Sequence, residues 1–188
     1  MSLQSQIDEL GARLSGLIRR LSECGYVFDR PEAVLPGPDP RAAEVIDRIS
    51  REVGPVPEAL ALFWLRVGSV DLSGSHPDWK EPAQCPDQLI VFPASLALYH
   101  LEDDEGGRLE YDLPFQIVVA PDELHKANTS GGPPYSVSVP SAAMDPPLNN
   151  SSEAETFLEH IDRALRCGGF PGLAGCKDHG WPLDSLKC

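Results

Sequence analysis

The sequence predicts a single α+β domain over residues 1–188, in which a mostly antiparallel sheet is flanked by helices. Apolar residues recur at helical spacing near both ends of the chain, and two segments between them show the composition and alternation of strands. A length of 188 residues is usual for one domain, and we see neither repeats nor an interdomain linker. A chain of this size buries enough surface to fold without a disulfide or a metal.

Residues 1–39 are expected to form an amphipathic helix followed by a proline-rich loop. Steps of three and four between apolar residues place them on one helix face. These residues are Ile7, Leu10, Leu14, Leu17, Ile18 and Leu21. The loop, DRPEAVLPGPDP, contains too many prolines for a helix or a central strand. Asp39-Pro40 then supplies a cap and a first-turn proline for a second helix, which ends at Gly54.

A third helix is expected to begin at Pro57-Glu58 and to carry two adjacent aromatic residues, Phe63 and Trp64. Both belong to the apolar stripe of this helix, so we expect both rings to lie in the core rather than to contact a ligand. An enclosed aromatic side chain stabilises a fold by about 3 to 5 kcal/mol. Gly68 can adopt the left-handed conformation that ends a helix.

The middle of the chain is expected to supply the sheet. Residues 89–92 predict a short strand, followed by a possible helix over residues 93–102, and residues 115–120 predict a longer strand. The segment YSVSVP, residues 135–140, alternates strictly. Its tyrosine and valines should therefore face the core and its two serines the opposite side.

The last helix is expected to follow a capping box made by Ser152 and Glu155 and to end at Gly168-Gly169. A capping box satisfies two backbone N–H groups that the first helical turn leaves without partners. The tail, residues 173–188, shows little periodicity. We therefore assign it no helix or strand.

The chain is strongly acidic, with 15 Lys and Arg against 29 Asp and Glu and a net charge of −14. Proteins bind nucleic acids and anionic membranes through basic side chains, so we expect no partner of either kind. A basic protein is the natural partner of such a surface. The alternative is that the charge only keeps the protein soluble, since net charge informs on solubility and association rather than on fold.

We expect a cytoplasmic protein without cofactors or metals. The first residues, MSLQSQIDEL, lack a cationic segment followed by an apolar one, and no run of about 18 apolar residues occurs. In the cytoplasm the five cysteines would remain thiols. They are Cys24, Cys85, Cys167, Cys176 and Cys188. The last three could bind zinc together with His179, but they lack the paired spacing of zinc sites.

No nucleophile elbow, phosphate-binding loop or zinc-protease motif occurs, so we predict no catalytic residues. The densest polar group is the loop DLSGSHPDW, which contains Asp71, His76, Asp78 and Trp79. Two carboxylates and an imidazole could serve a hydrolase or a metal enzyme. However, His-Pro-Asp is more typical of a turn, and an aromatic residue among acids also suits a partner-binding surface.

Two further polar groups offer chemistry in principle. The acidic turn at Asp103, Asp104 and Glu105 lacks the alternating carboxylates and final glutamate of a calcium loop, so we interpret it as a solvated glycine turn. Its charge also makes it a candidate for a second acidic partner contact. His125-Lys126 could act as an acid/base pair, but no nucleophile is indicated beside it.

Three segments together resemble the SUKH superfamily, which includes a fungal cell-wall assembly regulator and many bacterial immunity proteins. They are the helix from Pro57-Glu58 through Phe63-Trp64 to VGSVD, the run APDELHKANTSGGPPYSVSVP, and the closing TFLEHIDRALRCGGFPG. The resemblance covers residues 40–172. It implies an α+β fold with an antiparallel sheet flanked by helices, and it supplies no general catalytic residues.

The resemblance also implies a non-enzymatic protein-binding module. The first hypothesis is a bacterial immunity protein that neutralises a toxin, such as a basic nuclease, by direct binding. The second is a cytoplasmic scaffold or regulatory binding protein of the same superfamily with no toxin partner. The third, an unrecognised hydrolase or metal enzyme, rests on the DLSGSHPDW loop alone.

Overall fold

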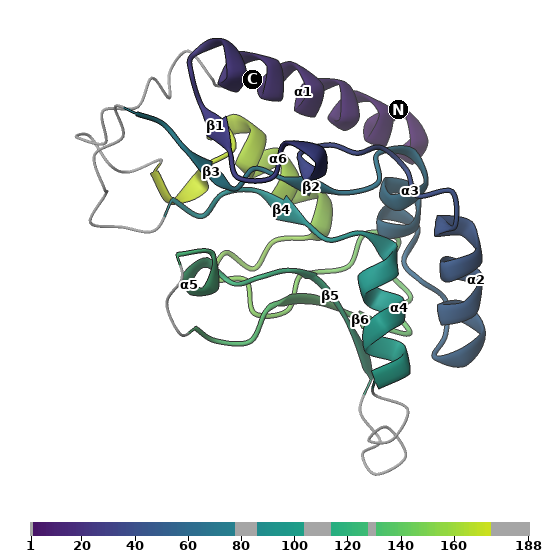
Figure 1. The fold of residues 1–188 in the computed structure, drawn as a ribbon. Coiled ribbons are helices and arrows are strands. Elements are labelled where there is room, and N and C mark those ends of the chain that lie inside the picture. The colour runs from purple at the N-terminus through teal and green to yellow at the C-terminus, as the bar shows by residue number, and fades with distance from the viewer. Residues whose placement is uncertain (1, 78–85, 104–113, 128–130, 174–188) are drawn as a thin grey trace.

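The computed structural model describes residues 2–77, 86–103, 114–127 and 131–173, and over these residues the chain has the predicted α+β fold (Figure 1). The helices are α1 (Leu3–Glu23), α2 (Ala42–Glu52), α3 (Glu58–Arg66), α4 (Ala94–Asp103), α5 (Glu123–Lys126) and α6 (Phe157–Arg166), with 3-10 turns at Pro31–Ala33 and Pro171–Leu173. The strands are β1 (Val27–Phe28), β2 (Val70–Asp71), β3 (Gly74–Ser75), β4 (Ile90–Val91), β5 (Phe115–Ala120) and β6 (Tyr135–Val139). No helix among the described residues is long and apolar enough to cross a membrane.

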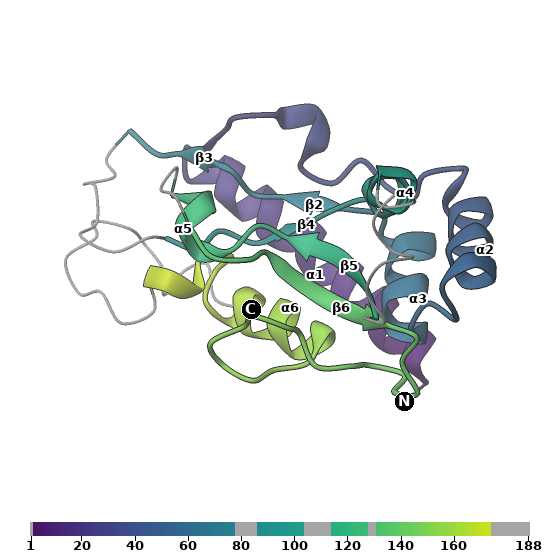
Figure 2. The same ribbon diagram turned by 90° about the horizontal axis from the view of Figure 1, so that it is seen from below.

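The strands form three antiparallel pairs, β1 with β3, β2 with β4, and β5 with β6. The pairs are connected to one another. The N–H of Leu72 donates to the carbonyl of Leu89 at 3.0 Å and so extends the β2–β4 pair, and β3 follows β2 along the chain after two residues. The N–H of Phe92, after β4, donates to the carbonyl of Val119 in β5 at 2.8 Å. The strands therefore form one strongly interrupted layer, which Figure 2 shows from below.

Helices cover this layer and gather at one of its ends. Helix α1 packs against α3 and α6, while α2 packs against α3 and α4. In both views α2, α3 and α4 lie at one end of the strands and α5 lies at the other (Figures 1 and 2). The apolar stripe of α1 is buried as predicted, except for Ile18, which is half-buried at its edge.

Two predicted helix starts are wrong. Helix α2 begins at Ala42, and Asp39 accepts the N–H of Arg41 at 2.8 Å in the turn before it. Helix α6 is capped by Thr156, whose capping box uses Glu159 rather than the predicted Ser152 and Glu155. The pattern of a hydroxyl residue followed three positions later by Glu occurs twice in succession here, and the structure uses the second occurrence.

The predicted alternation along β6 holds, since both serine hydroxyls bond to Gln116, but the serine side of the strand is also partly covered. Tyr135, Val137 and Val139 are buried, and so is Ser136. The hydroxyl of Ser136 donates to Oε1 of Gln116 at 3.0 Å, and its backbone pairs with that of Asn149. A later segment of the chain therefore covers the polar face of β6.

Helix α3 is followed by Val67 and Gly68, and at Gly68 the chain turns toward β2. Gly68 has a φ of +94°, which an L-residue adopts only with strain. The backbone of Gly37, in the proline-rich loop, lies against the same position, so that a Cβ on Gly68 would collide with the carbonyl oxygen of Gly37. The glycine predicted to end the helix therefore also lets the loop approach the helix end.

We predict that Gly68→Ala destabilises the protein, because the substitution adds both backbone strain and a collision. The strain alone should cost more than about 1 kcal/mol, which lowers Tm by more than about 2 to 4 °C in a protein of this size. Gly132→Ala is the matched control, since a Cβ there meets nothing within 4 Å. Differential scanning calorimetry of both variants checks this, and equal Tm values for the two would contradict the packing described.

Candidate functional site

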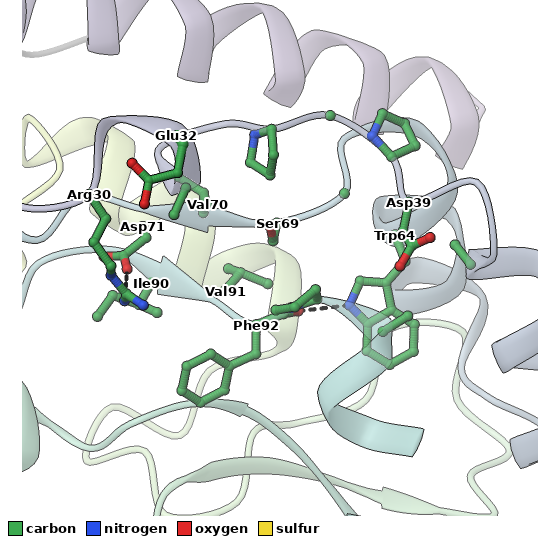
Figure 3. A pocket seen from close by; sticks show the side chains of 18 of the residues that line it. Arg30, Glu32, Asp39, Trp64, Ser69, Val70, Asp71, Ile90, Val91 and Phe92 are labelled. Atoms are coloured by element: carbon green, nitrogen blue, oxygen red, sulfur yellow. Dashed lines mark hydrogen bonds and ion pairs between the residues drawn. The ribbon is translucent and has the colours of Figure 1, made fainter. Parts of the chain in front are cut away.

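A cavity of about 530 Å³ lies between the proline-rich loop and the β2–β4 strand pair (Figure 3). Residues 30–42 supply part of its lining, residues 68–71 follow α3 into β2, and residues 90–94 connect β4 to α4. This volume lies within the usual range for ligand sites, about 300 to 1,000 Å³. Elements far apart in the sequence thus enclose one binding-sized space.

The lining is largely apolar. Pro36, Pro38 and Pro40 contribute to it from the loop, and Val91 and Phe92 contribute from the strand side. Phe92 belongs to the lining and is half-buried. Such a lining favours a ligand whose contacting surface is apolar rather than one that presents hydrogen-bonding groups.

Trp64 is buried, with 1% of its surface exposed, which confirms the prediction that it lies in the core. Its indole Nε1–H donates to the carbonyl oxygen of Phe92 at 2.9 Å. The ring also forms part of the cavity wall (Figure 3). Trp64 therefore fixes the chain between β4 and α4 at the cavity, in addition to its place in the core.

Four charged side chains line the cavity, and two of them neutralise each other. Arg30 forms an ion pair with Asp71, which is buried and also accepts the N–H of Ser73 at 2.9 Å. Glu32 is exposed and Asp39 half-buried, and neither has a cationic partner among the described residues. Figure 3 shows these two carboxylates toward opposite ends of the cavity.

The charged groups of the cavity are predominantly acidic. Its charged groups comprise one cation and three carboxylates, which leaves two negative charges at physiological pH. The indole N–H of Trp64 is already bonded, and Arg30 is held by Asp71. The site therefore suits a cationic, donor-bearing group and disfavours an anion.

Three of the predicted partner-binding residues belong to the described part of the chain, and each has different surroundings. Asp71 lines the cavity, whereas a ring nitrogen of His76 lies 2.7 Å from the carbonyl oxygen of Cys24, after α1. Asp103 is exposed at the end of α4. The other predicted residues lie outside the described part of the chain. They are Asp78, Trp79, Asp104 and Glu105.

The polar pair His125-Lys126 binds two different carboxylates. His125 Nδ1 lies 2.7 Å from Asp122, and the Lys126 ammonium, fully buried, donates to Asp87 at 2.7 Å. Burial alone would raise the pKa of Asp122, but hydrogen bonds from His125 and the first turn of α5 outweigh it and lower that pKa. Each of the two side chains thus binds its own carboxylate and helps to fix α5 in place. The two do not form an acid/base pair.

A buried carboxylate, Glu155, anchors α6. It accepts hydrogen bonds from Arg163 at 2.8 Å, and His160 Nδ1 lies 2.7 Å from it. Burial alone would raise the pKa of Glu155, but the hydrogen bonds from Arg163 and His160 outweigh burial and hold this pKa well below its ordinary value. The group is therefore ionised, paired and structural.

The described residues bring no three His, Cys, Asp or Glu side chains together in an arrangement that could hold a metal ion. Of the ligands weighed for zinc, Cys167 is half-buried after α6. Cys176, His179 and Cys188 lie outside the described residues. Nothing in the described structure adds a further ligand to that set.

Sequence reasoning missed the cavity because its charged residues belong to a segment interpreted only as a loop. Glu32 and Asp39 lie in DRPEAVLPGPDP, and Phe92 at the end of a short strand. The available signal was the prolines at every second position, 36, 38 and 40, which form an apolar wall without backbone donors.

No protein-family model, curated protein or solved structure matches the chain. The resemblance to the SUKH superfamily therefore stays a prediction, and the functional argument rests on the cavity and on charge.

We predict that Glu155→Gln is less stable than the unaltered protein at pH 7, on the order of 3 kcal/mol, because Arg163 loses its charge partner. A lowered folded-state pKa stabilises the fold above the ordinary pKa of glutamate, about 4.3, and this contribution is lost as the pH falls toward the folded-state pKa. The stability difference should therefore shrink below about pH 4.

Urea unfolding of both proteins across this pH range measures the difference. Glu153→Gln is the control, because Glu153 is exposed and close in sequence. A difference that does not depend on pH would show that the charge of Glu155 is not what stabilises α6.

Proposed function

We propose that this chain is a non-enzymatic protein-binding module, and that it acts as an immunity protein that neutralises a basic toxin by direct binding. The observation that carries the proposal is the apolar cavity with two carboxylates, Glu32 and Asp39, that lack cationic partners among the described residues. The net charge of −14 extends the same preference to the whole surface.

The cavity has the composition of an interface centre rather than of a reaction site. Interface centres are enriched in aromatic residues that bind in desolvated pockets, with charged groups at the rim. Phe92 is such an aromatic residue, and Glu32 is exposed beside the apolar lining. The lining contains no His, Cys or Lys. The Ser–His and Cys–His pairs of common hydrolases are therefore absent from this lining, which supports binding over catalysis.

The acidic surface supports a basic protein as the partner. Like-signed charge would repel a nucleic acid, whereas a cationic protein would be attracted over about 8 Å at physiological ionic strength. Such attraction accelerates association, while the desolvated centre sets how long the complex lasts. We place this binding in the cytoplasm, where the five cysteines of the chain would remain thiols.

The prediction is that a specific basic partner binds with an association rate that falls as salt rises, while its dissociation rate changes little. A tagged chain recovers candidates from its native host at low salt. Each candidate is then identified, purified and measured by biolayer interferometry over a range of salt concentrations. If no protein binds this chain directly at low salt, the protein-binding proposal is wrong.

A growth assay tests the immunity role separately. The identified partner, expressed alone, should arrest growth, and coexpression of this chain should restore it. A partner that binds directly but arrests nothing would contradict immunity and would favour the scaffold or regulatory role.

A further inference from the structure

We infer that the cavity binds an extended segment of the partner in which one apolar side chain is flanked by two basic side chains. The apolar side chain would pack against Phe92 and the proline wall, and the basic groups would contact Glu32 and Asp39. This inference rests on the proposed function and specifies the chemistry that the partner presents.

The apolar position follows from the walls of the cavity. Prolines at positions 36, 38 and 40 have no N–H, so this side offers carbon and carbonyl oxygen but no backbone donor at those positions. Val91 is buried on the opposite side, and the half-buried ring of Phe92 is the aromatic surface left for contact. An aliphatic side chain of the partner would bind favourably in such a space, because its burial there removes apolar surface from water.

The two basic positions follow from where the uncompensated charges lie. Glu32 and Asp39 stand toward opposite ends of the cavity (Figure 3), so one cationic head group cannot contact both. Arg30 lies near Glu32, but its ion pair with Asp71 compensates its charge. Each end of the cavity therefore retains one negative charge that a lysine or arginine of the partner would neutralise.

An extended conformation places alternate side chains on one side of a segment. A pattern of basic, apolar and basic residues at alternate positions would therefore present all three side chains to the cavity together. An anionic segment would be repelled by Glu32 and Asp39, and the charge of Arg30, the one cation in the lining, is already balanced by Asp71. The site thus selects for cationic over anionic partners.

The test uses the peptide Ac-Arg-Gly-Leu-Gly-Arg-NH2 and ¹⁵N-labelled full chain, followed by NMR. We expect weak binding, about millimolar. The shifted signals should be the Trp64 indole N–H and the amides of residues 68–71, 90–92 and 94. A second peptide has citrulline in place of both arginines. Citrulline has nearly the shape of arginine but no charge, so this peptide should bind more weakly than the first. The counterpart with glutamate at both positions should not bind.

Variants assign the two ends of the cavity. Glu32→Gln and Asp39→Asn should each weaken peptide binding by about 2- to 5-fold, as expected for partly exposed ion pairs. The two effects should combine multiplicatively, since the residues are well separated. Glu9→Gln is the matched control, an exposed carboxylate on α1 outside the cavity. Unchanged ¹⁵N spectra of the free variants establish that each one folds.

The inference is overturned if the peptide does not bind, if the citrulline peptide binds equally well, or if the shifts lie outside the cavity. A different result would contradict the proposed function, namely that no protein binds the chain directly. If a partner binds but Glu32→Gln and Asp39→Asn leave its affinity unchanged, the binding role stands and the cavity assignment is wrong.

Discussion

The close approach of Gly37 and Gly68 is the constraint on which the cavity depends. Each has positive φ, and the absence of a side chain on Gly68 lets the loop carbonyl lie against the end of α3. A second tie runs from the N–H of Asp71 to the carbonyl oxygen of Val34 at 3.2 Å. The proline-rich loop is thereby held along the start of β2, and its prolines form a fixed wall. Binding to such a wall loses little entropy, because the site already has its bound shape.

Charge is organised differently at the two ends of the strand layer. Near α5 and α6 the buried charged groups are paired, as Lys126 is with Asp87 and Glu155 is with Arg163. This is the expected arrangement, since an unpaired buried charge is very costly. At the cavity, Glu32 and Asp39 are open to water and have no cationic partner among the described residues. The first arrangement stabilises the fold, whereas the second is available to a partner.

The sequence predicted those features that local patterns determine. The stripe of α1, the glycine end of α3 and the strands β5 and β6 follow from periodicity and backbone chemistry, and the structure contains them. The predicted cap of α6 was wrong because two capping patterns occur in succession, and the pattern alone does not choose between them. Glu155 is held by Arg163 and His160, so that Glu159 makes the capping box.

The cavity could not be predicted in the same way. Its two walls come from the loop at residues 30–42 and from residues 90–94, and no local pattern indicates that they meet. The predicted loop residue Asp71 does line it, but as the ion-pair partner of Arg30. Composition gave the sign of the charge. Only the fold shows which carboxylates remain without cationic partners in the described part of the chain.

Hydrogen–deuterium exchange of the full chain, with and without its purified partner, tests most directly whether the cavity is the binding site. The account predicts slower exchange in residues 30–35, 68–71 and 90–92, where non-proline amides line or adjoin the cavity. Exchange in α5, which lies at the other end of the strands (Figure 1), and in β6 should not change, because neither element lines the cavity. Protection confined to α5 and β6, with unchanged exchange around the cavity, would contradict the account.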